Sequence, residues 1–87
     1  MGLDTVELLL STEELFGISI PDEVAEHIFT VGQLRDFIVE QQTKRGVPNV
    51  NGDIVFDQLR TLISHHLAVK PEEVVPHARF IEDLRAD

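Results

Sequence analysis

Apolar side chains recur at helical spacing in three stretches of the chain. Residues 3–16, 31–42 and 54–67 place them three or four positions apart, which is the spacing of one face of an α-helix. A fourth, short helix is predicted for residues 22–28, where the apolar positions fit about two turns. No stretch alternates apolar and polar residues for long enough to predict a strand. The positions expected to face the core are Leu8, Leu9, Thr12, Leu15, Phe16, Val24, Ala25, Ile28, Val31, Leu34, Phe37, Ile38, Val55, Leu59, Leu62, Ile63 and Leu67.

Short polar side chains indicate where the helices begin. Asp4 is a candidate N-cap of the first helix, with Glu7 three residues later as in a capping box. Thr30 and Gln33 have the same spacing before the second long helix. Asp53 is expected to cap the third long helix, because a short carboxylate accepts bonds from the free N–H groups of a first helical turn.

Glycines and prolines mark the connections between the helices. Gly17 is expected to end the first helix, since glycine readily adopts the left-handed conformation found after helix C-termini. Residues 43–53 combine glycine, proline and asparagine and are predicted to form a linker. The last 20 residues contain two prolines and are predicted to be mostly loop, with a helical turn around residues 80–84. Its expected anchors in the core are Val69, Val74, Phe80, Ile81 and Leu84.

Together these elements predict an all-α fold, a bundle of three main helices plus one short helix. A chain of 87 residues has room for one hydrophobic core, so residues 1–87 are expected to form a single domain. Its hydrophobic fraction of 43% is ordinary for a globular protein and too high for a disordered segment.

Charge narrows the range of partners. The net charge is −9, and it is unevenly placed: residues 1–42 hold nine acidic and one basic residue, whereas residues 43–87 hold seven acidic and six basic residues. Nucleic acids and anionic membranes would repel such a chain, so basic protein surfaces are the expected partners. No apolar run approaches the roughly 20 residues of a membrane span. The absence of cysteine fits a reducing compartment, and we expect a cytoplasmic protein.

Residue types that perform catalysis or bind metals are sparse. Without cysteine, thiolate metal sites and cysteine nucleophiles are excluded. His65 and His66 are adjacent on a predicted helix, so they face different directions and do not suit one metal ion. Residues 47–58 lack the acidic first and last ligands of a calcium loop, and none of the three serines lies in a G-x-S-x-G motif. We therefore expect no metal site and no enzymatic activity.

Two apolar residues of the first helix lie off its core-facing stripe. Val6 and Leu10 are interleaved with the carboxylates of Glu7, Glu13 and Glu14. The carboxylates here form either a solvated acidic face or a docking surface. Val6 and Leu10 either add apolar contacts to such a surface or are partly buried in the bundle.

Two blocks of the sequence resemble the acyl carrier protein family. Residues 3–42, beginning LDTVELLLSTEELFGISIPDEVAEHIFTV, look like the family's prosthetic-group helix, short helix and last helix. Residues 54–87, which contain HLAVKPEEV and ARFIEDLRAD, look like the family's first helix and the long loop after it. The resemblance implies the family's helical bundle and its role in carrying acyl chains in fatty-acid or polyketide synthesis.

The order of these blocks is rotated relative to the family. Residues 54–87 match the family's first half but follow residues 3–42, which match its second half, with 43–53 as the linker. A circular permutant, natural or engineered, would have this order, and so would a stretch cut from a tandem array. Asp87 and Leu3 match family positions one residue apart, so we expect a monomer whose two ends lie close together. A dimer that exchanges segments is the alternative.

The resemblance also implies a modification site, and the chain departs from it. Family members carry 4′-phosphopantetheine as a phosphodiester on the serine of a D-S-L motif. Asp87 and Leu3 match the flanking residues, but the serine position is Gly2, which has no hydroxyl. We therefore expect no attachment site and no cofactor in this chain. The alternative function is a helical protein-interaction module that carries no prosthetic group.

The family's contact with its partner enzymes suggests which residues bind. Family members dock on basic patches of these enzymes through the prosthetic-group helix. The matching residues here are Leu3, Asp4, Val6, Glu7, Leu10, Glu13 and Glu14.

Overall fold

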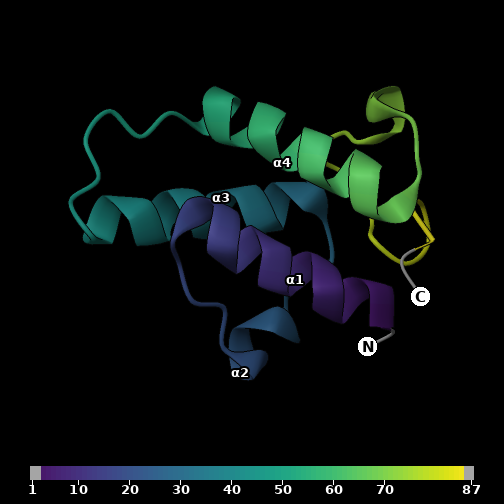
Figure 1. The fold of residues 1–87 in the computed structure, drawn as a ribbon, viewed down its shortest axis with the longest axis horizontal. Helices are drawn as coiled ribbons and strands as arrows, with labels where there is room; N and C mark the ends of the chain where they lie inside the picture. The colour runs from purple at the N-terminus through teal and green to yellow at the C-terminus, as the bar shows by residue number, and fades with distance from the viewer. Residues whose placement is uncertain (1–2, 86–87) are drawn as a thin grey trace.

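The computed structural model describes residues 3–85, and side chains from Thr5 to Arg85. It confirms the all-α fold class (Figure 1). Only an isolated antiparallel bridge joins Thr30 to Arg79, and the described residues form no strand. The elements are α1 (Leu3–Phe16), α2 (Asp22–Ala25), α3 (Val31–Lys44), α4 (Gly52–Leu67) and the 3₁₀ helix η1 (Pro71–Glu73).

The helix α4 packs against both α1 and α3. In Figure 1, α3 and α4 run antiparallel and are joined by a loop at the left end of the bundle. The short α2 lies below α1, and the segment after η1 returns to the opposite end, beside the beginning of α1. The described residues near the two ends of the chain therefore lie at one end of the bundle, and the linker lies at the other.

The core is built from the predicted faces of the helices. The polar residue Thr12 is fully buried among them. Its hydroxyl donates a hydrogen bond to the carbonyl oxygen of Leu8 at 2.8 Å, which offsets the free energy lost when the hydroxyl leaves water. The seven residues Phe16, Phe37, Ile38, Leu59, Leu62, Ile63 and Phe80 share one cluster, in which Phe37 and Leu62 are only partly buried. The buried apolar residues are Leu8, Phe16, Ile18, Ile20, Ala25, Val31, Leu34, Ile38, Val55, Leu59, Ile63, Val69, Val74, Ala78, Phe80 and Leu84.

Two predicted core residues are exposed. Leu15 is 50% exposed, because the inward line of α1 runs through Thr12 and Phe16, and Leu15 lies at its edge. Ile81 is 61% exposed, because a hydrogen-bonded turn directs Phe80 and Leu84 into the core on either side of it.

Of the three predicted N-caps, the structure confirms one and contradicts two. The capping box of Thr30 and Gln33 is present at the start of α3. Asp53 is not the cap of α4: the helix begins earlier, and the Oδ1 atom of Asn51 accepts the N–H of Asp53 at 2.8 Å. Asp4 is not an N-cap either, because α1 begins at Leu3 and therefore already includes it.

The connections also differ in length from the prediction. The short helix ends at Ala25 instead of residue 28, because the side chain of Gln33 accepts the N–H groups of both Phe29 and Thr30 and draws the chain out of helix. The helix α3 continues to Lys44, so the linker is residues 45–51. As predicted, Gly17 follows α1 with a positive φ of 64°.

No helix in the described part of the chain is long and apolar enough to cross a membrane.

Candidate docking face on α1

The acidic and apolar residues singled out on α1 lie on the side of the helix away from the core. Successive helical residues are rotated by about 100°, so Val6, Glu7, Leu10 and Glu14 fall within about a third of a turn. The buried Leu8 and the other inward residues occupy the opposite side. We call the surface formed by Val6, Glu7, Leu10 and Glu14 the α1 face.

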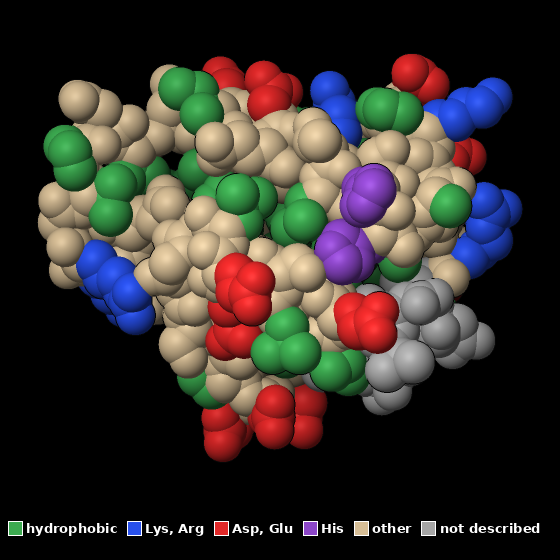
Figure 2. Space-filling view, viewed as in Figure 1, with side chains coloured by type: hydrophobic (Ala, Val, Ile, Leu, Met, Phe, Trp, Pro, Cys, Tyr) green, Lys and Arg blue, Asp and Glu red, His purple; other side chains and the backbone are tan. Residues whose placement is uncertain are grey.

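The exposure of its apolar residues argues against burial of Val6 and Leu10 in the bundle, and their part in docking stays a prediction. Val6 is 42% exposed and Leu10 is 55% exposed, so neither is packed into the bundle. Figure 2 shows acidic and hydrophobic side chains side by side over the face that carries α1, with Lys and Arg side chains towards the periphery. Within the described residues no salt bridge joins Glu7 or Glu14 to a base. Both carboxylates are therefore available to a basic partner.

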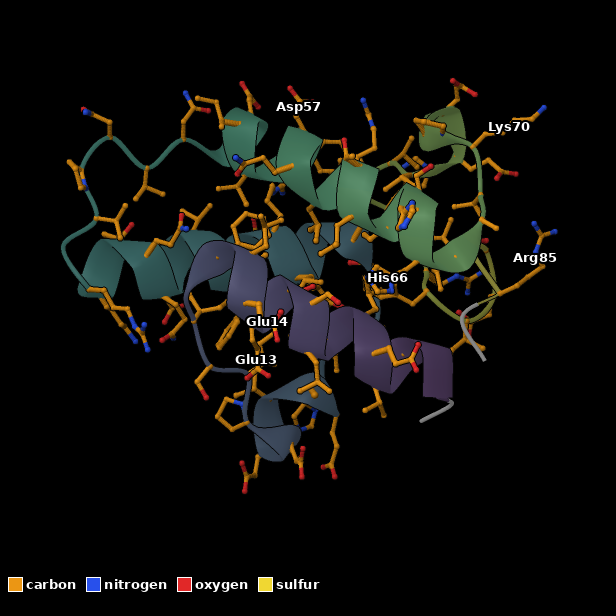
Figure 3. All side chains as sticks on the ribbon, in the orientation of Figure 1. Glu13, Glu14, Asp57, His66, Lys70 and Arg85 are labelled. Atoms are coloured by element: carbon orange, nitrogen blue, oxygen red, sulfur yellow. The ribbon has the colours of Figure 1, made fainter. Side chains whose placement is uncertain are left out.

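Glu13 has a role within the fold that the sequence did not indicate. Its Oε2 atom accepts the backbone N–H of Ile20 at 2.6 Å, and Ile20 is buried. In Figure 3, Glu13 lies towards the α1–α2 connection, below the labelled Glu14. A charged acceptor strengthens such a bond, so Glu13 holds this connection against α1. Its predicted part in partner binding is separate from this contact and stays a prediction.

The remaining predicted site residues lie at the limits of the structure. Leu3 and Asp4 belong to the first turn of α1, and their side chains lie outside the described part. Gly2, which matches the family's serine position and where no attachment is expected, and its flanking residue Asp87 also lie outside the described residues.

An apolar pocket lies where the beginning of α1 meets the last segment of the chain. It has a volume of about 200 Å³ and is lined mainly by apolar side chains. Sequence periodicity missed it because its walls come from three separate stretches of the chain: α1, α2 with the connection after it, and the last segment. The expected proximity of Leu3 and Asp87 was the signal that could have located it. Its lining residues are Thr5, Leu8, Leu9, Ala25, Glu26, Ile28, Phe29, Phe80, Ile81 and Glu82.

The three serines offer no replacement for the absent hydroxyl at position 2. Ser64 is half-buried on α4, and its Oγ atom donates to the carbonyl oxygen of Val69 at 2.6 Å. Ser11 is half-buried within α1, and Ser19 lies in the loop before α2. None of them is at the start of α1, where the family places its serine.

The titratable side chains of the described residues form no metal-binding cluster and show one shifted pKa. No cluster of three or more His, Asp or Glu residues suited to a metal ion occurs among the described residues. The pKa of Asp83 is lowered, first by the N–H of Arg79 that its carboxylate accepts, and it lies on the exposed last turn.

The chain is 56% identical over 42 residues to an acyl carrier protein of Rubrobacter xylanophilus, and the match covers 48% of this chain and 52% of the relative. Half of the chain is similar to an acyl carrier protein. The chain thus matches only about half the length of that relative. No family model matches the chain, and no solved structure matches it significantly.

The comparison supports the resemblance to acyl carrier proteins and agrees with the expectation of a chain that is not an enzyme. It does not address the rotated order, the absent serine or the docking residues, which stay predictions.

Proposed function

We propose that the chain is an acyl-carrier-protein-like domain that docks on basic surfaces of acyl-chain synthesis enzymes in the cytoplasm and does not itself carry an acyl chain. The identity of 56% over 42 residues to an acyl carrier protein is the observation that carries this proposal. The exposed apolar and acidic residues of the α1 face supply the surface for docking.

The geometry of the bundle supports a rotated segment order. Thr5 and Leu9 near the beginning of the chain line the same pocket as Phe80 and Ile81 near its end. The linker 45–51 lies at the opposite end of the bundle (Figure 1). An alignment that follows chain order also stops where a rotated order begins, so a match to about half of both chains is what rotation produces.

The residues present do not fit the family's prosthetic group. A phosphodiester needs a hydroxyl oxygen, and glycine at position 2 has none. We therefore derive no chemical step through 4′-phosphopantetheine in this chain, and the role left to it is recognition.

Loading with a phosphopantetheinyl transferase and coenzyme A, followed by intact-mass measurement, tests this proposal. We expect no adduct on the chain as it stands. A reordered chain, with residues 54–87 placed before residues 2–44 and carrying Gly2→Ser, should load stoichiometrically. The same reordered chain with Gly2 is the matched control and should not load.

The order of the segments is tested by Gly2→Ser in the existing order. We expect it to load more slowly than the reordered Gly2→Ser chain, because in this order residues 54–87 are not joined directly to the serine, and the transferase would have to bring the two segments into place. Equal rates would show that continuity before the serine is unimportant.

The absent hydroxyl keeps a second candidate function open, a helical interaction module that carries no prosthetic group. If the reordered Gly2→Ser chain also fails to load while remaining folded, this second function is favoured.

Docking is tested with a transferase or synthase that has a basic carrier-binding surface. Glu7→Lys combined with Glu14→Lys should weaken association strongly at low salt, chiefly through the association rate. Glu72→Lys combined with Glu73→Lys changes the net charge equally but on η1, and should have a much smaller effect. Equal effects of the two double variants would exclude the α1 face as the docking surface.

A further inference from the structure

The linker places an asparagine directly before a glycine at the point where α4 begins. Asparagine occurs at two positions of the chain, 49 and 51, and only Asn51 is followed by glycine. The side chain of Asn51 is exposed. Gly52 has no Cβ atom, so nothing on it hinders the approach of its backbone nitrogen to the side-chain amide carbon of the preceding residue. The pair therefore has the composition in which an asparagine is most easily attacked by its own backbone.

The backbone N–H of Gly52 takes no part in the cap of α4. The Oδ1 atom of Asn51 accepts the N–H of Asp53 at 2.8 Å and the N–H of Ile54 at 3.3 Å. Gly52 is the first residue of α4, so its own N–H has no acceptor one turn earlier in the helix. The nitrogen that would attack Asn51 is thus the one that the cap leaves unengaged.

The cap nevertheless holds Asn51 in an unreactive conformation. Its φ of −131° and ψ of 120° are extended, which turns the nitrogen of Gly52 away from the side-chain amide carbon. Bringing these two atoms together requires rotation about the Cα–C bond of Asn51. That rotation also turns the carbonyl oxygen of Asn51 away from the N–H of Val55, which it accepts at 3.0 Å. The attack therefore takes place only after the first turn of α4 has opened.

Opening this turn exposes little apolar surface. Residues 43–54 contain no buried side chain, and Val55 is the first buried residue of α4. The turn lies beside the linker, at the end of the bundle away from the last segment (Figure 1). Such ends open locally without unfolding of the whole domain. A polar N-cap typically shifts the equilibrium towards the closed turn by about fivefold.

From these observations we propose that Asn51 is a deamidation site, controlled by the opening of the first turn of α4. In the open turn the deprotonated nitrogen of Gly52 attacks the Cγ atom of Asn51. The bond from Cγ to the side-chain nitrogen breaks, and this nitrogen leaves as ammonia. Water then opens the cyclic imide: breaking its N–Cγ bond gives aspartate in an ordinary backbone, and breaking its other C–N bond gives isoaspartate, with the chain continuing through Cγ.

The two products have different effects on α4. Aspartate is as good an N-cap as asparagine, and its negative charge is favourable at the start of a helix. Isoaspartate adds a methylene group to the main chain and takes Cγ into the peptide bond, so the capping oxygen is lost from its place. The proposal goes beyond the proposed function, since it needs neither a prosthetic group nor a partner.

Incubation of the full chain in mildly alkaline buffer, followed by proteolytic digestion and mass spectrometry of the peptides, tests the proposal. Asn51 should show the mass increase of an amide converted to an acid. Asn49, which precedes Val50, is the internal control and should stay unmodified. Isoaspartyl methyltransferase with S-adenosylmethionine should methylate the aged chain and leave the fresh chain unmethylated. Equal modification of Asn49 and Asn51, or an unmodified Asn51 after the urea-unfolded chain has been converted, would overturn the proposal.

The control by the cap is tested separately. In urea that unfolds the chain, Asn51 should react about fivefold faster than in the folded chain. Val50→Gly places a glycine after Asn49, which caps no helix, so in this variant Asn49 should react faster than Asn51 in the same molecule. Equal rates with and without urea, or a slower reaction of Asn49 in the variant, would exclude the opening of α4 as the controlling step.

Gly52→Ala tests the requirement for glycine. A Cβ atom at this position meets nothing within 4 Å, so the fold should be kept. The added Cβ atom crowds the attacking nitrogen, and alanine favours the closed helical turn, so Asn51 should react several times more slowly. An unchanged rate in this variant would contradict the proposed attack by the nitrogen of residue 52.

Discussion

The two non-helical segments of the chain connect to the bundle in very different ways. The linker 45–51 is exposed except at Val50, which is half-buried, and contributes no fully buried side chain. The last segment, residues 74–84, buries four of its residues although it forms no helix. These four are Val74, Ala78, Phe80 and Leu84.

Backbone hydrogen bonds strengthen this contrast. The N–H groups of Val31 and Gly32 donate to the carbonyl oxygens of Ala78 and Pro76 at 3.0 and 2.8 Å. The N–H of Phe80 donates to the carbonyl oxygen of Phe29 at 2.9 Å. The bonds from Val31 and Gly32 provide partners for the first N–H groups of α3, which have none within their own helix. The last segment is thus part of the folded core, whereas the linker buries no side chain fully and joins two helix ends, with Asn51 capping α4.

The largest expected effect of this difference is at Phe80. Phe80→Ala should lower the free energy of unfolding by about 3–5 kcal/mol, because it removes a buried ring and enlarges the adjacent pocket. Val47→Ala in the linker, where the side chain is 43% exposed, should change it by less than about 0.5 kcal/mol. Urea unfolding of both variants measures the difference. Similar midpoints for the two would mean that the last segment is not part of the core.

A second, smaller effect concerns the close approach at Gly32. A Cβ atom there would lie 2.9 Å from the carbonyl oxygen of Pro76, and both groups belong to backbone that cannot move freely. Gly32→Ala should therefore cost about 1–3 kcal/mol. Gly52→Ala is the matched control: a Cβ atom there meets nothing within 4 Å, and alanine favours helix, so stability should rise slightly. Thermal unfolding compares them, and a stabilised Gly32→Ala variant would contradict the packing described here.

The same contrast explains what the sequence could predict. The long helices follow from local periodicity, which is why α1 and the inward faces of α3 and α4 are predicted closely. The contacts of Gly32 with Pro76 and of Phe29 with Phe80 join residues far apart in the chain, and no local pattern encodes them. The pocket at the same place was missed for this reason.

The local errors have a different origin. Asn51 and Asp53 are two residues apart and both are good N-caps, so propensity alone does not choose between them. Glu13 reads as one more surface carboxylate, because its bond to Ile20 depends on how the loop returns. The exposure of Val6 and Leu10 agrees with their angular position on α1, off the core-facing stripe, although the sequence left their partial burial open.

The linker should tolerate lengthening. Doubling the length of the linker by inserting glycine and serine residues before Val50 should cost about 0.6 kcal/mol, because loop-closure entropy grows slowly with length and the linker has no fully buried side chain to displace. Chemical denaturation measures the cost. A loss of several kcal/mol would show that the linker stabilises the bundle directly, and a dimer in gel filtration would show exchange of segments between two chains.

The smallest expected effect is on how the free energy of unfolding depends on pH, and it should differ between the last segment and the linker. The carboxylate of Asp83 accepts the backbone N–H of Arg79 at 2.8 Å, and this bond, more than the nearby guanidinium, lowers the pKa of Asp83 below its ordinary 3.8. Because the folded pKa is depressed, the stabilisation is present above the unfolded pKa and is lost as the pH falls through the folded pKa.

Asp83→Asn should therefore reduce the free energy of unfolding at neutral pH and flatten its decline on acidification below about pH 4. Unfolding curves from pH 7 to pH 2 test this at the last turn. The linker contains no carboxylate, so its lengthened variant should keep the parent's full pH dependence. If Asp83→Asn and the parent decline in parallel, the hydrogen bond to Arg79 does not contribute to holding the last turn in place.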